Sequence, residues 1–202
     1  MRIAATALVA LLAAGAYADR LISIPIGRKL RYKEFRIEGA FEPYKNGLFE
    51  SYLAGGITTG FDLEVRSQRL RGEPGFTAAD LSYNILSPIA DLAPGASVGV
   101  QDALDVTRDG RYFYLAITIR KTYTTLDGDV PGDVTLGVKQ GRYLYPFLGV
   151  SIPFSQAFRF IAEHDGIRPA AGIDLTFARQ VGLRFYFRGE QGFVSLRYTR
   201  QF

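Results

Sequence analysis

The chain has 202 residues, of which 48% are hydrophobic and 13% aromatic, with 24 Lys and Arg against 20 Asp and Glu and no cysteine. Without cysteine, neither a disulfide framework nor lipid attachment to a cysteine is possible, so packing and backbone hydrogen bonds must provide the stability. The small basic excess is spread along the sequence, which excludes a basic patch for nucleic acid.

The N-terminus has the pattern of a secretory signal peptide. Met1 and Arg2 give a positive start, residues 3–16 are apolar, and Ala16-Tyr17-Ala18 is a small-x-small motif. The apolar run of roughly 14 residues is shorter than the ~20 that a membrane-spanning helix needs. We therefore expect residues 1–18 to be removed by cleavage near Ala18, which leaves residues 19–202 as one exported domain.

From there to the C-terminus, apolar and polar residues alternate in short segments, and helical periodicity is hard to find. The clearest segment is residues 111–121, in which Phe113 and Leu115 face one side and Tyr112 and Tyr114 the other. Turn residues such as Asp127-Gly128, Pro131-Gly132 and Asp165-Gly166 separate many of the segments. In chain order, the segments are residues 31–40, 48–54, 61–66, 79–86, 96–101, 111–121, 133–139, 143–152, 158–165, 170–178, 183–188 and 192–202.

This pattern predicts an all-β domain: a single closed antiparallel transmembrane β-barrel of about twelve strands, with about ten or fourteen also compatible. A soluble β-sandwich shows a similar alternation and is the main structural alternative. A sandwich exposes Lys, Glu and Asp to water, whereas here the polar face mixes Arg, Tyr, Gly, Thr and acids. Such a mixture is more typical of a confined lumen, which favours the barrel.

The last segment ends as many outer-membrane barrels do, with a C-terminal phenylalanine. Val194, Leu196, Tyr198 and Phe202 share one face, while Arg197 and its even-spaced neighbours point the other way. We therefore predict that Tyr198 and Phe202 belong to a signal for the barrel-assembly machinery, and that outer-membrane lipid contacts the apolar face.

The polar face supplies the side chains expected to line the lumen. Acids and bases interleave there, so they can pair across a narrow interior and offset their desolvation. Bases outnumber acids in this set, which indicates a mildly positive lumen that favours anionic solutes, although a paired and plugged interior is equally compatible. The predicted lumen residues are Arg36, Asp62, Glu64, Arg66, Tyr112, Tyr114, Arg120, Lys139, Arg159, Glu163, Asp174, Arg184, Tyr186 and Arg197.

Enzymatic chemistry has little support in the sequence. The only histidine, His164, lies between Glu163 and Asp165, but its parity places it on the lipid side, and no serine adjoins it. We therefore predict no catalytic residue, no cofactor and no metal site. A lipid-modifying outer-membrane enzyme remains the less favoured alternative.

Three segments carry a resemblance to a known family. These are Leu21-Ile22-Ser23-Ile24-Pro25, the pair 96–102 and 112–116, and Ala162-Glu163-His164-Asp165-Gly166 followed by residues 171–175. Together they cover most of the chain beyond Ala18, and in order and spacing they resemble the YjbH family of outer-membrane proteins, which is associated with capsule and exopolysaccharide export genes. The resemblance implies a non-enzymatic accessory to export or retention of surface exopolysaccharide, with the polysaccharide or its export proteins as partners. A small pore or structural barrel unrelated to polysaccharide is the alternative.

Overall fold

The computed structural model describes residues 20–27, 30–44, 47–178 and 180–202, and in these ranges every named element is a strand. The predicted signal peptide, residues 1–18, lies outside the described residues. The strands are β1 (Glu34–Phe41), β2 (Phe49–Gly56), β3 (Phe61–Arg69), β4 (Phe76–Leu86), β5 (Gly95–Gln101), β6 (Tyr112–Thr125), β7 (Gly128–Gln140), β8 (Leu144–Pro153), β9 (Phe158–His164), β10 (Pro169–Ala178), β11 (Val181–Arg188) and β12 (Gln191–Gln201).

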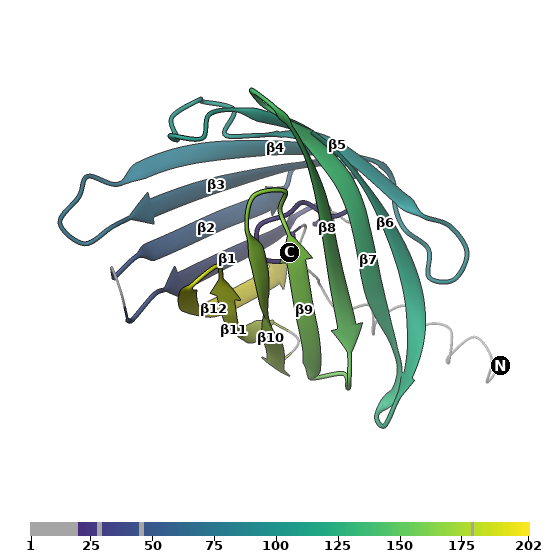
Figure 1. Ribbon diagram of the computed structural model, residues 1–202. Coiled ribbons are helices and arrows are strands. Elements are labelled where there is room, and N and C mark those ends of the chain that lie inside the picture. Colours follow the sequence, from purple (N-terminus) through teal and green to yellow (C-terminus); the bar gives the residue numbers. More distant parts are fainter. Residues whose placement is uncertain (1–19, 28–29, 45–46, 179) are drawn as a thin grey trace.

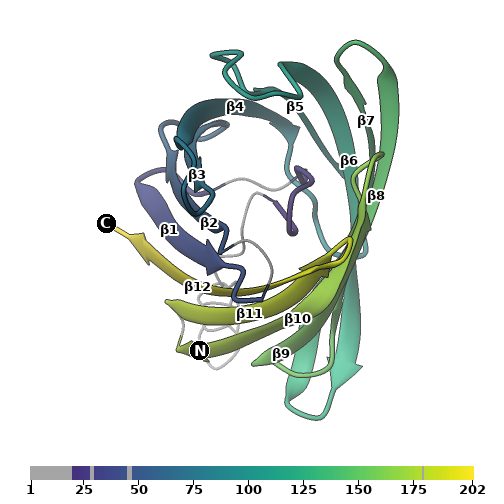
Figure 2. The ribbon, with the colours of Figure 1, turned by 60° about the vertical axis from the view of Figure 1, so that its left-hand side comes forward.

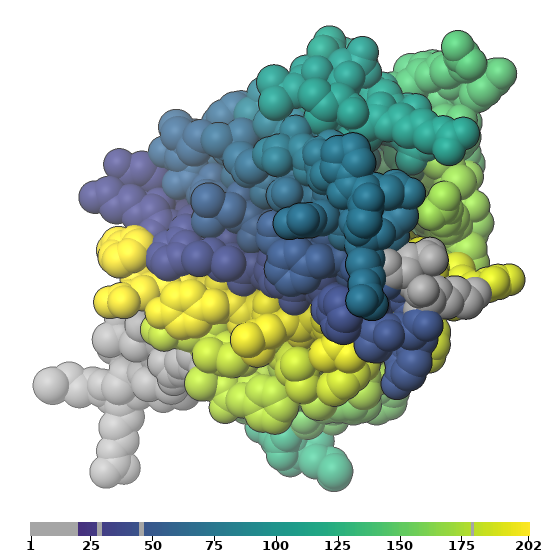
Figure 3. All heavy atoms as spheres, turned by 90° about the vertical axis from the view of Figure 1, so that its left-hand side faces the viewer, coloured from purple at the N-terminus to yellow at the C-terminus, as the bar shows by residue number. Residues whose placement is uncertain are grey.

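Each strand pairs antiparallel with its neighbours in sequence, and β1 pairs with β12, so the sheet closes into a barrel (Figure 1). In the closing pair, Glu34 lies opposite Gln201 and Phe41 opposite Val194. The purple and yellow strands that meet in Figure 3 are this seam. The structure confirms the prediction of a closed antiparallel barrel and gives twelve strands.

Side-chain alternation gives the barrel an apolar outside and a polar inside. In β6, Phe113 and Leu115 are 60% and 43% exposed, whereas Tyr114 and Ala116, which alternate with them, are buried. The same alternation in the other strands makes an apolar outer surface. In the described part of the chain, no helix is long and apolar enough to cross a membrane. The exposed residues of the strands include Ile37, Phe41, Leu53, Ile117, Ile119, Leu136, Leu148, Phe185, Phe187, Val194 and Leu196.

One predicted boundary is wrong. Pro131-Gly132 is not a turn but part of β7, which runs from Gly128 through Pro131, where Thr122 is the opposite residue on β6. The turn lies at residues 126–127, just before Gly128, whose φ of 112° suits glycine. β6 and β7 therefore form the longest hairpin of the barrel, visible as the green arm that extends lowest in Figure 1.

Candidate functional site

The lumen contains a piece of the protein's own chain. Residues 20–27 and 30, here called the lumenal segment, precede β1 and lie inside the ring of strands, where Figure 2 shows the purple trace. A bridge between Arg20 and Pro25 and a hydrogen bond from the Leu21 amide to the Ile24 carbonyl, 3.1 Å, fold its start into a tight turn. The lumenal segment is therefore a compact insert that leads directly into the wall.

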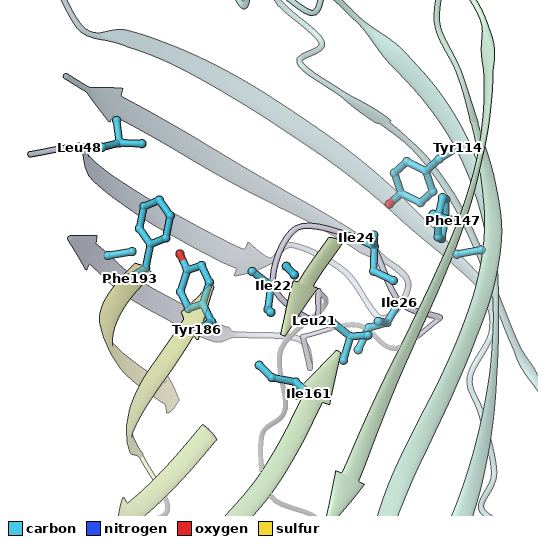
Figure 4. Packing of buried hydrophobic residues seen from close by; sticks show 13 residues of the cluster. Leu21, Ile22, Ile24, Ile26, Leu48, Tyr114, Phe147, Ile161, Tyr186 and Phe193 are labelled. Carbon is cyan, nitrogen blue, oxygen red and sulfur yellow. The ribbon is translucent and has the colours of Figure 1, made fainter. Parts of the chain in front are cut away.

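Apolar side chains of the lumenal segment form a core in the middle of the barrel. Leu21, Ile22, Ile24 and Ile26 are each at most 6% exposed and belong to one cluster with wall residues (Figure 4). The burial of each such side chain contributes roughly 1.5–3 kcal/mol. The wall residues of the cluster are Ala40, Leu48, Tyr114, Ala116, Phe147, Ile161, Ala170, Tyr186 and Phe193.

Two wall glycines make room for this core. A Cβ at Gly149 would lie 2.3 Å from Leu21 Cδ1 and 2.5 Å from Ile24 Cδ1, and a Cβ at Gly95 would lie 2.8 Å from the Gly27 carbonyl oxygen. Larger residues at either position would collide with the lumenal segment. The wall is thus shaped to the segment that it encloses.

Polar side chains of the wall satisfy the backbone of the lumenal segment. The Glu163 carboxylate accepts hydrogen bonds from the amides of Ile22 and Ser23, both 2.8 Å. The Thr118 hydroxyl accepts from the Gly27 amide at 2.7 Å, and Asp62 accepts from the amide at residue 30 at 3.1 Å. These bonds replace the strand ladder that a buried, unpaired segment lacks.

Arg20 joins the lumenal segment to the charges of the wall. Its guanidinium lies 3.1 Å from Glu38 and 3.3 Å from Glu64, and it stacks on the Tyr52 ring at 3.5 Å from the centroid. Glu64 also pairs with Arg36. A buried guanidinium is stabilised only where carboxylates and hydrogen bonds offset its desolvation, and here two carboxylates and an aromatic face do so.

A second cluster of charges adjoins the first on β10, β11 and β12. Asp174 accepts from Arg184 at 3.0 Å and from two nitrogens of Arg197 at 3.0 and 3.1 Å. Arg184 also donates to the Leu21 carbonyl at 2.6 Å and lies 3.7 Å from Glu38. The wall charges therefore hold the lumenal segment as well as one another.

All the lumen residues predicted from the sequence have the inward parity of their strands. Most are buried, and Arg66, Tyr112 and Arg120 are half-buried nearer the ends of the barrel. The predicted acid-base pairing occurs, but several partners differ: Arg120 pairs with Asp133 at 2.7 Å and Lys139 with Asp165 at 3.5 Å. Whether any of them contacts a transported solute stays a prediction.

The expected positive bias of the lumen stays a prediction. Ten carboxylates and six cationic side chains are buried among the described residues, but two of these acids, Glu42 and Asp102, lie outside the strands, and the inward-facing Arg66, Arg120 and Arg188 are half-buried. Five further acids also point into the lumen by the parity of their strands. The sequence-based prediction does not include them, because the alternation of apolar and polar residues around them is weaker. These acids are Glu34, Glu38, Glu50, Asp80 and Asp133.

Two small cavities lie beside the lumenal segment. One cavity of about 60 Å³ lies beside Arg20, Ser23 and Tyr52, and another of about 20 Å³ lies beside Arg159 and Asp174. Since a water molecule occupies about 30 Å³ of liquid, these spaces suit a few waters and no larger solute. The lumenal segment occupies the part of the lumen around these cavities.

The remaining predicted residues lie on the outer face. Tyr198 is half-buried near Phe35, and Phe202 is 73% exposed and stacks on Phe35 at 5.3 Å. His164 faces outward, and its Nδ1 accepts a hydrogen bond from the Gly166 amide at 3.1 Å. In the described part of the chain, no group of three or more His, Cys, Asp or Glu side chains could hold a metal ion.

The principal omission of the sequence-based prediction is the lumenal segment. Arg20, Ile22 and Ser23 carry contacts that no alternation pattern reveals. One signal was present: an apolar run with Pro25 just after the predicted cleavage site, too short for a membrane helix and without strand alternation.

The fold and the filled lumen define the class of the molecule: a closed antiparallel β-barrel with an internal segment. A scan against protein-family models finds no match to this chain, and a search of curated proteins finds none either. Among solved structures, the NanC porin is similar at 11% identity, with 83% of this chain and 98% of that chain covered and a TM-score of 0.46. The N-terminal β-barrel domain of Pseudomonas aeruginosa OprF is similar at 12% identity, with 84% and 98% covered and a TM-score of 0.30. The argument on function therefore rests on the geometry of the chain itself.

Proposed function

We propose that this protein is a non-enzymatic outer-membrane β-barrel, closed at rest by its lumenal segment, that assists export or retention of surface exopolysaccharide. The observation that carries the proposal is the combination of an apolar outer wall with a filled, charge-paired lumen. In hydrocarbon, every backbone group must be paired within the protein, and a closed barrel is the β-structure that achieves this.

Membrane insertion has a direct test by cell fractionation and gel migration. We expect the protein in the outer-membrane fraction, with different migration in SDS before and after boiling, because closed barrels resist unfolding in SDS. A soluble periplasmic protein without a shift would contradict the proposal. Deletion of Phe202 is expected to lower the amount of inserted protein while synthesis continues, since we propose that the C-terminal strand is read by the barrel-assembly machinery.

The polysaccharide role rests on the resemblance to the YjbH family and is supported by the lumenal segment packed inside the barrel. A barrel closed at rest does not act as a general diffusion pore. We expect loss of the gene to reduce cell-bound or secreted exopolysaccharide while outer-membrane permeability to small antibiotics stays the same. Unchanged polysaccharide together with altered permeability would contradict the proposed role.

A second candidate, a small gated pore, is favoured by one specific observation. Among the described residues, the lumenal segment pairs with no strand of the wall, and its one β-bridge joins Arg20 to Pro25 within the segment. The segment can therefore leave the lumen without breaking the backbone ladder of the barrel, at the cost of its hydrogen bonds to wall side chains such as Glu163 and Arg184. A gated pore would take up solutes only after the lumenal segment is displaced. A barrel that acts as an export accessory without a pore would take up no solute.

A further inference from the structure

One end of the barrel carries the turns that follow β1, β3, β5, β7, β9 and β11, opposite the end at which β12 finishes; we call it the distal mouth. At this mouth, three tyrosines meet. The ring centroids of Tyr112 and Tyr145 are 5.9 Å apart at 76°, and those of Tyr143 and Tyr145 are 6.3 Å apart at 89°. We call Tyr112, Tyr143 and Tyr145 the tyrosine platform.

Interfacial packing against lipid does not explain the platform. Tyr112 shares its face of β6 with the buried Tyr114, and Tyr145 shares its face of β8 with the buried Phe147, so both rings point toward the lumen. Tyr143 lies in the turn before β8 and is 64% exposed. Aromatic girdles face outward at the membrane surface, whereas this platform lines the inner edge of an opening.

A cation lies beside the platform. Lys139 Nζ is 5.0 Å from the Tyr112 ring centroid and 6.0 Å from that of Tyr145. The ammonium also pairs with Asp165 at 3.5 Å, and the Lys139 side chain is 9% exposed. The turns that follow β7 and β9 also carry Arg142 and Arg168, and the acids whose charges act on Tyr112 are Asp109 and Asp165.

We propose that the tyrosine platform and Lys139 bind an acidic saccharide, such as a uronic-acid oligomer, at the distal mouth. The apolar faces of sugar rings pack on tyrosine rings, and the phenolic hydroxyls suit sugar hydroxyls. Lys139 supplies a charge-assisted hydrogen bond to the ligand carboxylate. This inference deepens the proposed function and rests on it for its biological setting, but binding itself is measured on the purified protein.

The test is calorimetric titration of the purified, detergent-solubilised full-length mature protein with tetragalacturonate, and with maltotetraose as a neutral oligomer of the same length. We expect tetragalacturonate to bind more tightly, with an affinity that falls as salt is added, because charge contributes to the contact. The double variant Tyr112→Leu with Tyr145→Leu, which keeps bulk but removes the hydroxyls and aromatic faces, is expected to lower affinity about tenfold.

Matched variants separate stacking from charge. Lys139→Gln is expected to weaken tetragalacturonate binding about fivefold and leave maltotetraose unchanged. Controls are Tyr44→Ala, an 87% exposed tyrosine in another turn of the same mouth, and Lys121→Gln near the opposite end; both should bind as the wild type does. If the double variant fails to show the heat-dependent gel shift, the exposed Tyr143→Ala alone is expected to weaken binding about threefold.

Two results would overturn the inference: no tetragalacturonate binding by the wild type, or equal affinity in the wild type and the platform variants. The cellular test of the proposed function is independent of this one. Binding without any change of surface polysaccharide on gene deletion would leave the site intact and refute the proposed role. A change of surface polysaccharide on gene deletion without tetragalacturonate binding would refute the proposed site and support the proposed role.

Discussion

Glu163 shows how a single wall side chain positions the lumenal segment. Its two oxygens accept from the amides of Ile22 and Ser23, at 2.8 Å each, in a site from which water is largely excluded. Sequence parity predicts that Glu163 points inward, but its partners are backbone amides about 140 residues earlier in the chain, a relation that no local pattern reveals.

Glu163→Ala removes both acceptors and leaves buried amides unpaired, at a cost of about 1–3 kcal/mol for each group. We therefore expect the temperature at which unboiled protein converts to the boiled gel position to fall by several degrees. Glu73→Ala, in an exposed turn, is the matched control and should leave this temperature unchanged. An unaltered conversion temperature in Glu163→Ala would show that the lumenal segment does not depend on this carboxylate.

Asp165 gives a pH dependence at the distal mouth. Burial favours the neutral carboxyl, but hydrogen bonds from the Arg168 and Ile167 amides, 2.6 and 2.8 Å, and the charge of Lys139 outweigh it and lower the pKa of Asp165. A lowered pKa stabilises the folded state above the pKa of the unfolded chain, about 4, and this contribution is lost as the pH falls through the folded value.

We accordingly expect the conversion temperature of the wild type to decrease between pH 6 and the acid range below about pH 4. Asp165→Asn should have a lower conversion temperature at pH 6 and a smaller decrease on acidification, because the titrating group is gone. Asp105→Asn in the exposed turn after β5 serves as the comparison. Identical pH profiles for Asp165→Asn and the wild type would contradict this assignment.

At the scale of elements, alternation predicts the strands well and their ends poorly. β6 was found from Phe113 and Leu115 against Tyr112 and Tyr114, since period-two burial is a local property of the strand. Pro131-Gly132 predicts a turn because both residues favour turns, yet the long ladder with β6 overrides that preference. The lumenal segment was missed because its burial depends on the width of the barrel, which no local pattern encodes.

The fit between β8 and the lumenal segment is testable at Gly149. Gly149→Leu places a side chain where Leu21 and Ile24 now lie, so we expect the lumenal segment to be displaced and the barrel to conduct ions. Gly55→Leu is the control, because a Cβ at Gly55 meets nothing within 4 Å. Both variants should keep the heat-dependent gel shift. A correctly inserted Gly149→Leu barrel that does not conduct ions would show that another part of the chain closes the lumen.

On the scale of the whole molecule, strand number explains why an internal segment is present. Barrels of about eight strands are filled by their own side chains, while those of about sixteen or more leave an aqueous channel. The twelve strands of this barrel lie between these limits, and the lumenal segment occupies the difference. Of the two predicted alternatives, an open pore and a plugged interior, the lumenal segment favours the plugged one, and the choice between them stays a prediction.

The central claim is that the lumenal segment closes a membrane barrel. Its most direct test is ion conductance across a planar lipid bilayer, comparing the wild type with a variant in which Leu21, Ile22, Ile24 and Ile26 are all replaced by serine. We predict that the wild type inserts without steady conductance and that the variant, with the same heat-dependent gel shift, gives stable open channels. Steady wild-type channels equal to those of the variant would contradict the account.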